Sequence, residues 1–153
     1  MSAGYVIDSS VLITFKRNQP RDIYRTLWKR LESLFRDGDA VVPREALDEL
    51  DRGTDDLGDW VKKTDAVYET TADVLTVVAD ISRRHPGWVR GTQNAADPFI
   101  IATAKVLGAV AVSNETHRPA TVEANLKIPQ VASEFGVMTM STNDFFRELG
   151  WQF

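Results

Sequence analysis

The feature that most constrains the fold is an alternation of short apolar runs with longer segments of helical periodicity. The apolar runs, rich in β-branched residues, lie at residues 4–7, 40–43, 109–113 and 137–141. Each has the length of a short buried strand, and the segments between them are long enough for helical crossovers. Strands separated by helices pair in parallel, since a parallel pair needs a long connection. The sequence therefore predicts an α/β fold, a three-layer α/β/α sandwich with a small parallel sheet of about four strands.

The helical segments are recognised by apolar spacing and by their stop signals. They are predicted at residues 9–16, 22–38, 44–53, 55–63, 71–87, 96–108, 128–136 and 142–150, and residues 88–96 are predicted to form a loop. In the second segment, the residues expected to face the core are Ile23, Leu27, Leu31 and Leu34.

Length and composition set the class of protein. A chain of 153 residues without an internal repeat or linker is predicted to form one domain, residues 1–153. There are no cysteines, which excludes disulfides and thiolate metal sites. No apolar run reaches the length of a membrane span, so the chain is expected to act in the cytoplasm, away from membranes. The net charge of −4 argues against a general electrostatic binder of nucleic acid.

Acidic residues recur at the ends of the predicted strands. Asp8 follows the first strand, Glu45 and Glu49 lie one turn apart on the helix after the second, and Glu115 follows the third. Asp97 begins the apolar helix 96–108. Since ligands bind at the carboxyl ends of parallel strands, these groups are expected to meet there. Hard divalent cations such as Mg²⁺ prefer oxygen ligands from several elements.

Each acid also has a plain structural interpretation. Asp8 and Asp97 both suit the N-cap of a helix, the latter with Pro98 at the first helical position. Glu49 alone fits a solvated helix residue, and Glu115 alone is a loop acid. Their joint placement favours a metal site, because capping gives no reason for acids to recur at successive strand ends.

Four stretches carry a resemblance to a known family: IDSSVLI, VPREALDEL, ADPFIIATAKVLGAVAVSNE and MSTNDFFREL. In this order they resemble the motifs of the PIN domain, a family of metal-dependent ribonucleases, and more narrowly a PIN-like subgroup from bacteria and archaea. The resemblance covers nearly the whole chain. The family usually has aspartate where this chain has Glu115. The positions that match the family's acids and its small polar residues are Asp8, Glu49, Asp97, Glu115, Ser10 and Ser113.

The resemblance implies a Mg²⁺- or Mn²⁺-dependent endoribonuclease that hydrolyses phosphodiester bonds of RNA. It implies Asp8 and Asp97 as main metal ligands, with Glu49 as a ligand or as the group that orients the attacking water. Glu115 would serve a second metal, and Ser10 would hold a carboxylate or the scissile phosphate. It also suggests a toxin that pairs with an antitoxin protein, and a homodimer.

Two groups of basic residues could contact an RNA substrate around the acidic site, and they have two interpretations. Lys16 and Arg17 end the first helix, and the stretch RRHPGWVRG gathers Arg83, Arg84, Trp88 and Arg90, a combination suited to phosphate contact and base stacking. The other interpretation is a solvated helix end with the tryptophan packed in the core. His85 and His117 are expected to be surface residues.

Functions from other classes remain open at this stage. A phospho-acceptor domain would use Asp55 and Asp56, although these follow no apolar run, and a haloacid-dehalogenase-type phosphatase would need a second aspartate at Ser10. A PIN-like module that has lost catalysis and binds RNA or a protein is the closer alternative. Stabilisation by Mg²⁺ or Mn²⁺ separates it from the enzyme.

Overall fold

The sheet contains five parallel strands in a computed structural model that describes residues 3–53, 55–115 and 120–153. The strand order is β3-β2-β1-β4-β5. The strands are β1 (Tyr5–Ile7), β2 (Ala40–Pro43), β3 (Val67–Tyr68), β4 (Val110–Val112) and β5 (Thr139–Met140). The predicted parallel sheet is confirmed, with one strand more than expected. The sequence did not indicate β3, because a two-residue strand offers no periodicity to read.

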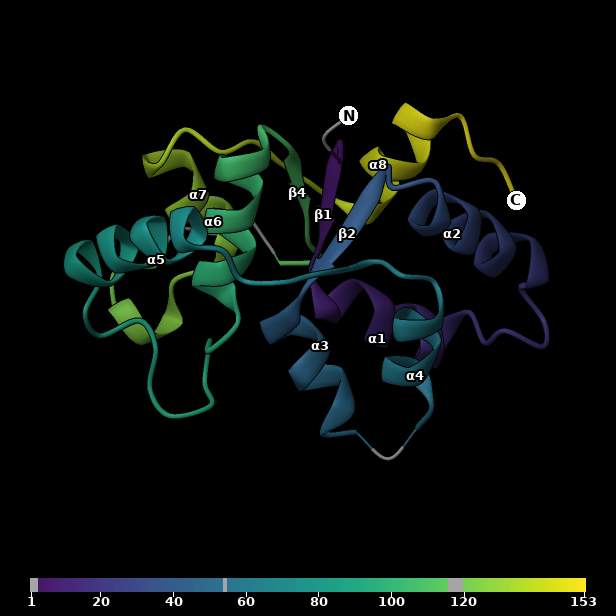
Figure 1. Cartoon of the computed structure of the whole chain (residues 1–153), viewed down its shortest axis with the longest axis horizontal. Helices are drawn as coiled ribbons and strands as arrows, with labels where there is room; N and C mark the ends of the chain where they lie inside the picture. The colour runs from purple at the N-terminus through teal and green to yellow at the C-terminus, as the bar shows by residue number, and fades with distance from the viewer. Residues whose placement is uncertain (1–2, 54, 116–119) are drawn as a thin grey trace.

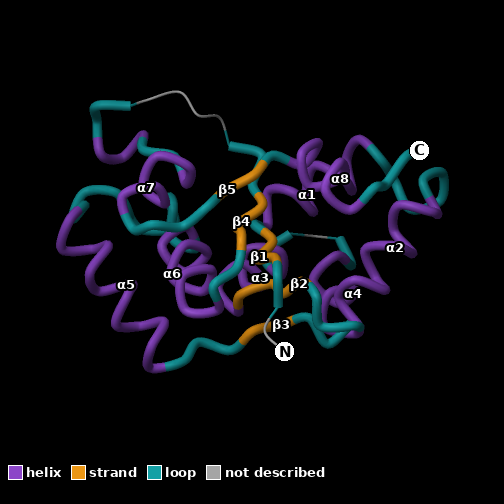
Figure 2. Tube along the Cα trace, turned by 90° about the horizontal axis from the view of Figure 1, so that it is seen from above, coloured by secondary structure: helices purple, strands orange, loops and turns teal. Residues whose placement is uncertain are grey.

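The described chain contains eight helices, and seven of them cover the two faces of the sheet. They are α1 (Ser9–Asn18), α2 (Arg25–Arg36), α3 (Arg44–Asp51), α4 (Leu57–Lys63), α5 (Ala72–Arg84), α6 (Asp97–Leu107), α7 (Ile128–Glu134) and α8 (Thr142–Leu149), with a 3₁₀ turn η1 (Glu123–Asn125). Seen down the length of the strands, α5, α6 and α7 lie on one side of the sheet and α1, α2, α4 and α8 on the other (Figure 2). The helix α3 lies below the carboxyl ends of the strands (Figure 1). The molecule is therefore a three-layer α/β/α sandwich, as predicted.

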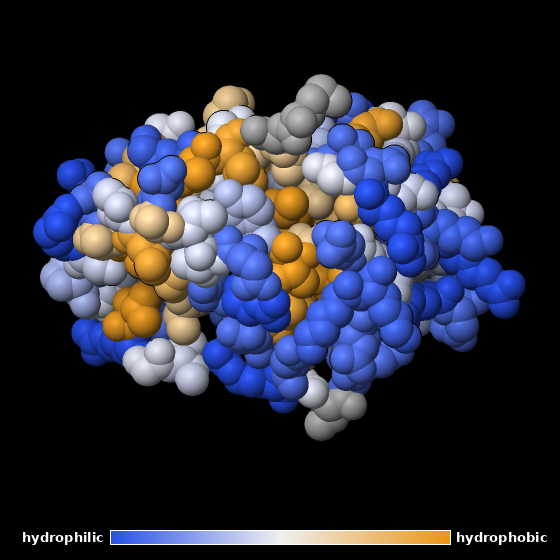
Figure 3. All heavy atoms as spheres, in the orientation of Figure 1, coloured by the Kyte–Doolittle hydropathy of each residue, from blue (hydrophilic) through white to orange (hydrophobic). Residues whose placement is uncertain are grey.

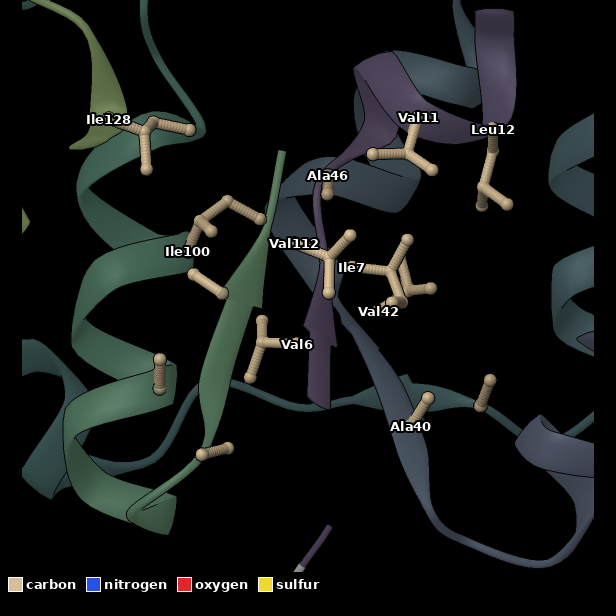
Figure 4. Close-up of a cluster of buried hydrophobic side chains, with 14 of the residues drawn as sticks. Val6, Ile7, Val11, Leu12, Ala40, Val42, Ala46, Ile100, Val112 and Ile128 are labelled. Atoms are coloured by element: carbon tan, nitrogen blue, oxygen red, sulfur yellow. The ribbon is translucent and has the colours of Figure 1, made fainter. Parts of the chain in front are cut away.

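The core forms on both faces of β1. Val6 faces Ile100 of α6, whereas Ile7 points to the opposite side, towards α1 and Leu12 (Figure 4). All four side chains are fully buried. Alternate strand residues thus serve the two helical layers, which explains why the strands read as continuous apolar runs.

Two predictions about individual side chains were wrong. Ile23 is 69% exposed, because α2 begins only at Arg25 and Ile23 lies in the preceding turn, where its N–H donates to the carbonyl of Pro20 at 3.1 Å. His85 is not a free surface residue. Its ring nitrogens lie 3.3 Å from Glu123 and 2.5 Å from Glu134, so it links the end of α5 to η1 and α7. His117 lies outside the described residues.

The strand order reverses at β1, and this places the crevice of the fold. From β1 the chain adds β2 and β3 on one side, and later β4 and β5 on the other. The carboxyl ends of β1 and β4 point to the edge from which α1 and α3 begin (Figure 1). Asp8 follows β1, and Ser113 follows β4. Ligands bind at such a switch point in open parallel sheets.

The surface agrees with this layered arrangement. Hydrophilic residues cover much of the face shown in Figure 3, and apolar atoms show mainly towards its middle and its α5 side. Within the described residues, no helix is long and apolar enough to cross a membrane.

Candidate metal and phosphate site

All five residues predicted to act in catalysis line one cleft of about 400 Å³ at the carboxyl edge of the sheet. A larger hollow of about 560 Å³ lies on α2 and the C-terminal segment, but Asp37 is the single acid among its lining residues. The cleft of about 400 Å³, which gathers several acidic side chains, is therefore the candidate functional site. Its predicted members are Asp8, Ser10, Glu49, Asp97 and Glu115.

Asp8 is held by hydroxyl groups from two elements. Ser10 Oγ donates to Asp8 Oδ2 at 2.7 Å, and Ser113 Oγ donates to the same oxygen at 3.1 Å. Asp8 occupies the N-cap position of α1 without a capping hydrogen bond of regular geometry, and its main donors are the two serine hydroxyls, so capping alone does not account for it. Burial raises the pKa of Asp8, while the hydrogen bonds from Ser10 and Ser113 oppose that rise.

Glu49 is anchored to the start of α1. Ser9 Oγ donates to Glu49 Oε2 at 2.7 Å and lies 3.4 Å from Asp8 Oδ1, so one serine stands between the two carboxylates. Glu45, one turn earlier on α3, is instead bonded by Thr70. The two acids of this helix therefore have different surroundings, and Glu49 is the one that lines the cleft.

Asp97 has a strongly perturbed carboxyl group. It is the first residue of α6, and Ala96 holds the N-cap position, so the predicted capping role of Asp97 is wrong by one residue. The side chain is buried, with 8% exposure. Desolvation, and then the negative charges of Glu115, Asp8 and Glu49, raise the pKa of Asp97 to about 8.

Glu115 lines the cleft and is also hydrogen-bonded to the start of α7. Its Oε2 accepts a hydrogen bond at 2.5 Å from the N–H of Ile128, the first residue of α7. Its own N–H donates to Ser113 Oγ at 3.1 Å. Burial raises the pKa of Glu115, and the Ile128 N–H opposes that rise. Glu115 therefore joins the acidic cleft to the amino end of α7.

The four carboxylates share a cleft but do not close on a single point. No group of three histidine or acidic side chains in the described part of the chain is close enough, as it stands, to hold an ion. Glu49 and Glu115 each have a protein donor instead. The elements thus bring the acids together, and side-chain rotation would have to complete a coordination shell.

The cationic groups near the acids are ones that the sequence did not indicate. Arg52, the C-cap residue of α3, lines the cleft together with Thr92 and Asn94. Lys127, just before α7, lies near enough to lower the pKa of Asp97 and of Glu115. A spacing signal for Arg52 existed, because it lies three residues after Glu49 on the same helix. Lys127 lies 12 positions after Glu115, outside any shared helix, and had no such signal.

Several residues predicted to contact the substrate have partners within the protein instead. Trp88 is buried, and its indole donates to the Leu126 carbonyl at 2.9 Å, which confirms its interpretation as a core residue. Arg83 pairs with Asp80, and Arg84 lies 3.3 Å from Glu134. These two arginines therefore belong to the α5 surface.

Asp55 and Asp56, the pair that a phospho-acceptor domain would use, instead form contacts that hold α4 to the rest of the fold. Asp55 accepts from the Leu57 N–H at 3.1 Å, and Asp56 is bound by Lys16 at 2.7 Å and Arg21 at 2.5 Å. Lys16 and Arg21 lower the pKa of Asp56 to about 2. Both acids lie between α3 and α4 rather than after a strand, which does not suit a phospho-acceptor.

The protein has a PIN-like three-layer α/β/α fold with an acidic cleft at the carboxyl edge of its sheet. The chain belongs to the family DUF4411, described as a domain of unknown function, whose model matches residues 5–153. A crystal structure of VapBC2 from Rickettsia felis, bound to a DNA fragment from their promoter, contains a similar fold. The match has a TM-score of 0.50 at 14% identity and covers 90% of this chain and 97% of that chain. No curated protein matches the sequence.

Proposed function

We propose that this protein is a metal-dependent ribonuclease of the PIN type. The observation that carries the proposal is the meeting of Asp8, Glu49, Asp97 and Glu115, from four separate elements, in one cleft at the switch point of the sheet. Desolvation, and then repulsion by Glu115, Asp8 and Glu49, raises the pKa of Asp97 to about 8, and such perturbed carboxyl groups cluster at functional sites. The sequence motifs and the PIN-like fold support the same conclusion.

The donor set fits a hard divalent cation. Carboxylates from Asp8, Glu49, Asp97 and Glu115 supply oxygen ligands of the kind that Mg²⁺ and Mn²⁺ prefer. Asp97 and Asp8 would be the main ligands, because they are the most buried of the four. When bound, the cation supplies Lewis-acid chemistry, which acidifies water and stabilises negative charge on the phosphate.

The surrounding residues position these groups. Ser10 and Ser113 fix the rotamer of Asp8, and Ser9 fixes that of Glu49. Glu49, at the half-buried rim, is suited to orient a water for attack on phosphorus and to accept its proton. Arg52 and Lys127 supply the positive charge that draws an RNA phosphate towards an otherwise acidic cleft.

Cleavage of a labelled single-stranded RNA tests the proposal directly. The parent should cut with Mg²⁺ or Mn²⁺ and not with EDTA, and Asp8→Asn and Asp97→Asn should each lower the rate by orders of magnitude. Glu45→Gln is the matched control, since Glu45 lies on the same helix as Glu49 but is bonded to Thr70. If Asp97→Asn cuts as fast as the parent, the proposed site is wrong.

A second candidate is a PIN-like module that binds RNA or a protein without cleaving. What favours it is that Glu49 and Glu115 already have donors in the protein, and that no three described acids approach closely enough to hold an ion. The two candidates differ in metal binding. A cation that binds only the native state must raise the melting temperature, and an inactive module should show no such rise.

We propose in addition that the ribonuclease acts as the toxin of a toxin–antitoxin pair. The support is the resemblance of the sequence to PIN domains, many of which act in this way. Induced expression in a bacterial host should then arrest growth, and Asp97→Asn should not. Normal growth with an active, well-expressed parent would exclude the toxin role while leaving the ribonuclease intact.

A further inference from the structure

A second cleft opens beside the acidic one and has a different chemistry. It has a volume of about 280 Å³ and is formed by the C-terminal half of α1 and the start of α8. Phe15 and Phe146, whose rings stack with centroids 5.6 Å apart, form its apolar part. Its polar lining is neutral and comes chiefly from Thr14, Gln19, Asn114, Thr142 and Asn143. Amides and hydroxyls beside aromatic rings are suited to a flat, polar-edged ligand.

The two clefts are physically joined. Asn114 Nδ2 donates to the backbone carbonyl of Ser10 at 3.2 Å, and Thr142 Oγ1 donates to Asn114 Oδ1. Ser10, which lines the acidic cleft, and Thr14, which lines the second, are four residues apart on α1. That spacing puts them on one helix face about 6 Å apart. A nucleotide next to a phosphate in the acidic cleft therefore lies within reach of the second.

Gln19 is the least satisfied polar residue of the second cleft. Its Oε1 is enclosed and finds no hydrogen-bond donor within the described chain. The residue itself is held firmly, because its N–H donates to the Phe15 carbonyl at 2.7 Å and its carbonyl accepts from the Trp28 indole at 2.6 Å. An enclosed acceptor without a donor is unfavourable, and because Gln19 lines the cleft, rotation of its side chain would bring this oxygen to a donor that arrives with a ligand.

We propose that this second cleft is a base-reading subsite that takes an adenine from the nucleotide beside the scissile phosphate of a single-stranded RNA. The assignment rests on the proposed ribonuclease function. The volume of about 280 Å³ suffices for a purine, given that a cavity of about 150 Å³ holds benzene. Adenine presents an amine beside a ring-nitrogen acceptor, which is the pattern that a glutamine amide matches with two hydrogen bonds. Bases of single-stranded RNA are commonly read in this way, by stacking and by their edges.

Equilibrium binding separates this subsite from cleavage. In an Asp97→Asn background, which should not cut, labelled RNA hexamers of adenine, cytosine and uracil are titrated by fluorescence anisotropy with Mg²⁺ present. The adenine hexamer should bind most tightly. Adding Gln19→Leu should weaken its binding by roughly five- to a hundredfold, the loss expected for a bidentate pair of hydrogen bonds, and should change uracil binding less. Gln152→Leu, the same change at an exposed position, should alter neither.

Two further measurements complete the test. Gln19→Leu should melt at the same temperature as its background or higher, because it removes an unsatisfied buried acceptor. In the cleaving parent, sequencing of the cut ends should show adenine enriched at one fixed position next to the cut, and Gln19→Leu should erase that enrichment.

The outcomes distinguish the two proposals. Cleavage without base preference, or with a preference that Gln19→Leu leaves unchanged, overturns the subsite and leaves the ribonuclease standing. An adenine preference that Gln19→Leu abolishes, in a protein that never cleaves with any metal, supports the subsite and overturns the ribonuclease. Absence of binding to all three hexamers overturns the subsite, and the cleavage assay then decides the ribonuclease alone.

Discussion

Glu115 Oε2 accepts the N–H of Ile128 at 2.5 Å, so a carboxylate of the acidic cleft also holds the first residue of α7. The backbone donors at a helix start have no partner within the helix, and a carboxylate there both accepts a hydrogen bond and favours the helix dipole. Glu115 therefore has a structural role that Asp8 and Asp97 lack. A cation in the cleft would have to share this carboxylate with α7 or draw it away.

The first prediction separates the two roles of Glu115. Glu115→Gln keeps an oxygen acceptor for Ile128, whereas Glu115→Ala removes it, so Ala should cost about 1 kcal/mol of stability more than Gln. Glu115→Gln should also reduce RNA cleavage far less than Asp97→Asn does. Urea unfolding of the metal-free variants and single-turnover cleavage measure the two effects. A cleavage loss in Glu115→Gln as deep as in Asp97→Asn would make Glu115 a primary ligand.

The hydrogen bond between Glu115 and Ile128 also predicts which metal supports faster cleavage. Because Glu115 is committed to Ile128, it can offer a cation only a constrained geometry, and Mn²⁺ tolerates distorted coordination better than Mg²⁺. The parent should therefore cleave faster with Mn²⁺ than with Mg²⁺, and Glu115→Asp should narrow that difference. Single-turnover rates with each metal decide the point. Equal Mn²⁺ to Mg²⁺ ratios in the two proteins would contradict the geometric argument.

Removal of the Asp97 charge should stabilise the metal-free protein. This buried carboxylate is disfavoured by desolvation and by three neighbouring acids, and an amide of the same shape escapes both effects. In EDTA near pH 8, Asp97→Asn should gain more than about 1.4 kcal/mol, the free energy of one pKa unit. Denaturant unfolding measures the gain. Asp144→Asn, at an exposed position of α8, serves as the control and should show little change.

The pH dependence of stability has a definite sign. The native pKa of Asp97 is about 8 against an ordinary value of 3.8, so the native state binds this proton more tightly than the unfolded chain does. Metal-free stability should fall as pH rises from about 4 to about 8, and the raised pKa values of Asp8 and Glu115 act in the same direction. Melting in EDTA at pH 6 and pH 8 tests this. Asp97→Asn should flatten the profile, and a flat profile in the parent would contradict the raised pKa of Asp97.

Arg52 and Lys127 should matter for RNA binding rather than for folding. Both are exposed and lie near the acidic cleft, so replacement of either by alanine should weaken binding across sequences and lower the salt slope by about one, the effect of one phosphate left without its cation. Anisotropy titrations at several salt concentrations supply the slopes. Arg83→Ala, which removes a cation paired with Asp80 on α5, is the matched control. If all three variants keep the salt slope of the parent, neither Arg52 nor Lys127 binds the RNA.

Local pattern determined much of the architecture. The runs at residues 4–7 and 40–43 became strands because buried parallel strands are continuously apolar, and that property is visible without any neighbour. The same local logic placed Asp8 directly after a strand and Asp97 at the start of a helix. The sequence by itself thus determined the layered α/β fold and the edge of the sheet at which the acids are found.

Only the tertiary structure decided which groups these acids meet. Ser9 bonds Glu49 across 40 positions of sequence, Ser113 bonds Asp8 across 105, and Lys127 stands beside Asp97 and Glu115. No local window contains both partners of either serine–carboxylate pair. The Glu115 contact with α7 and the enclosed Gln19 amide likewise arise from packing between distant elements. The periodicity of a segment reports which of its faces is buried, whereas the partner of a buried polar group depends on the elements that the whole fold brings against it.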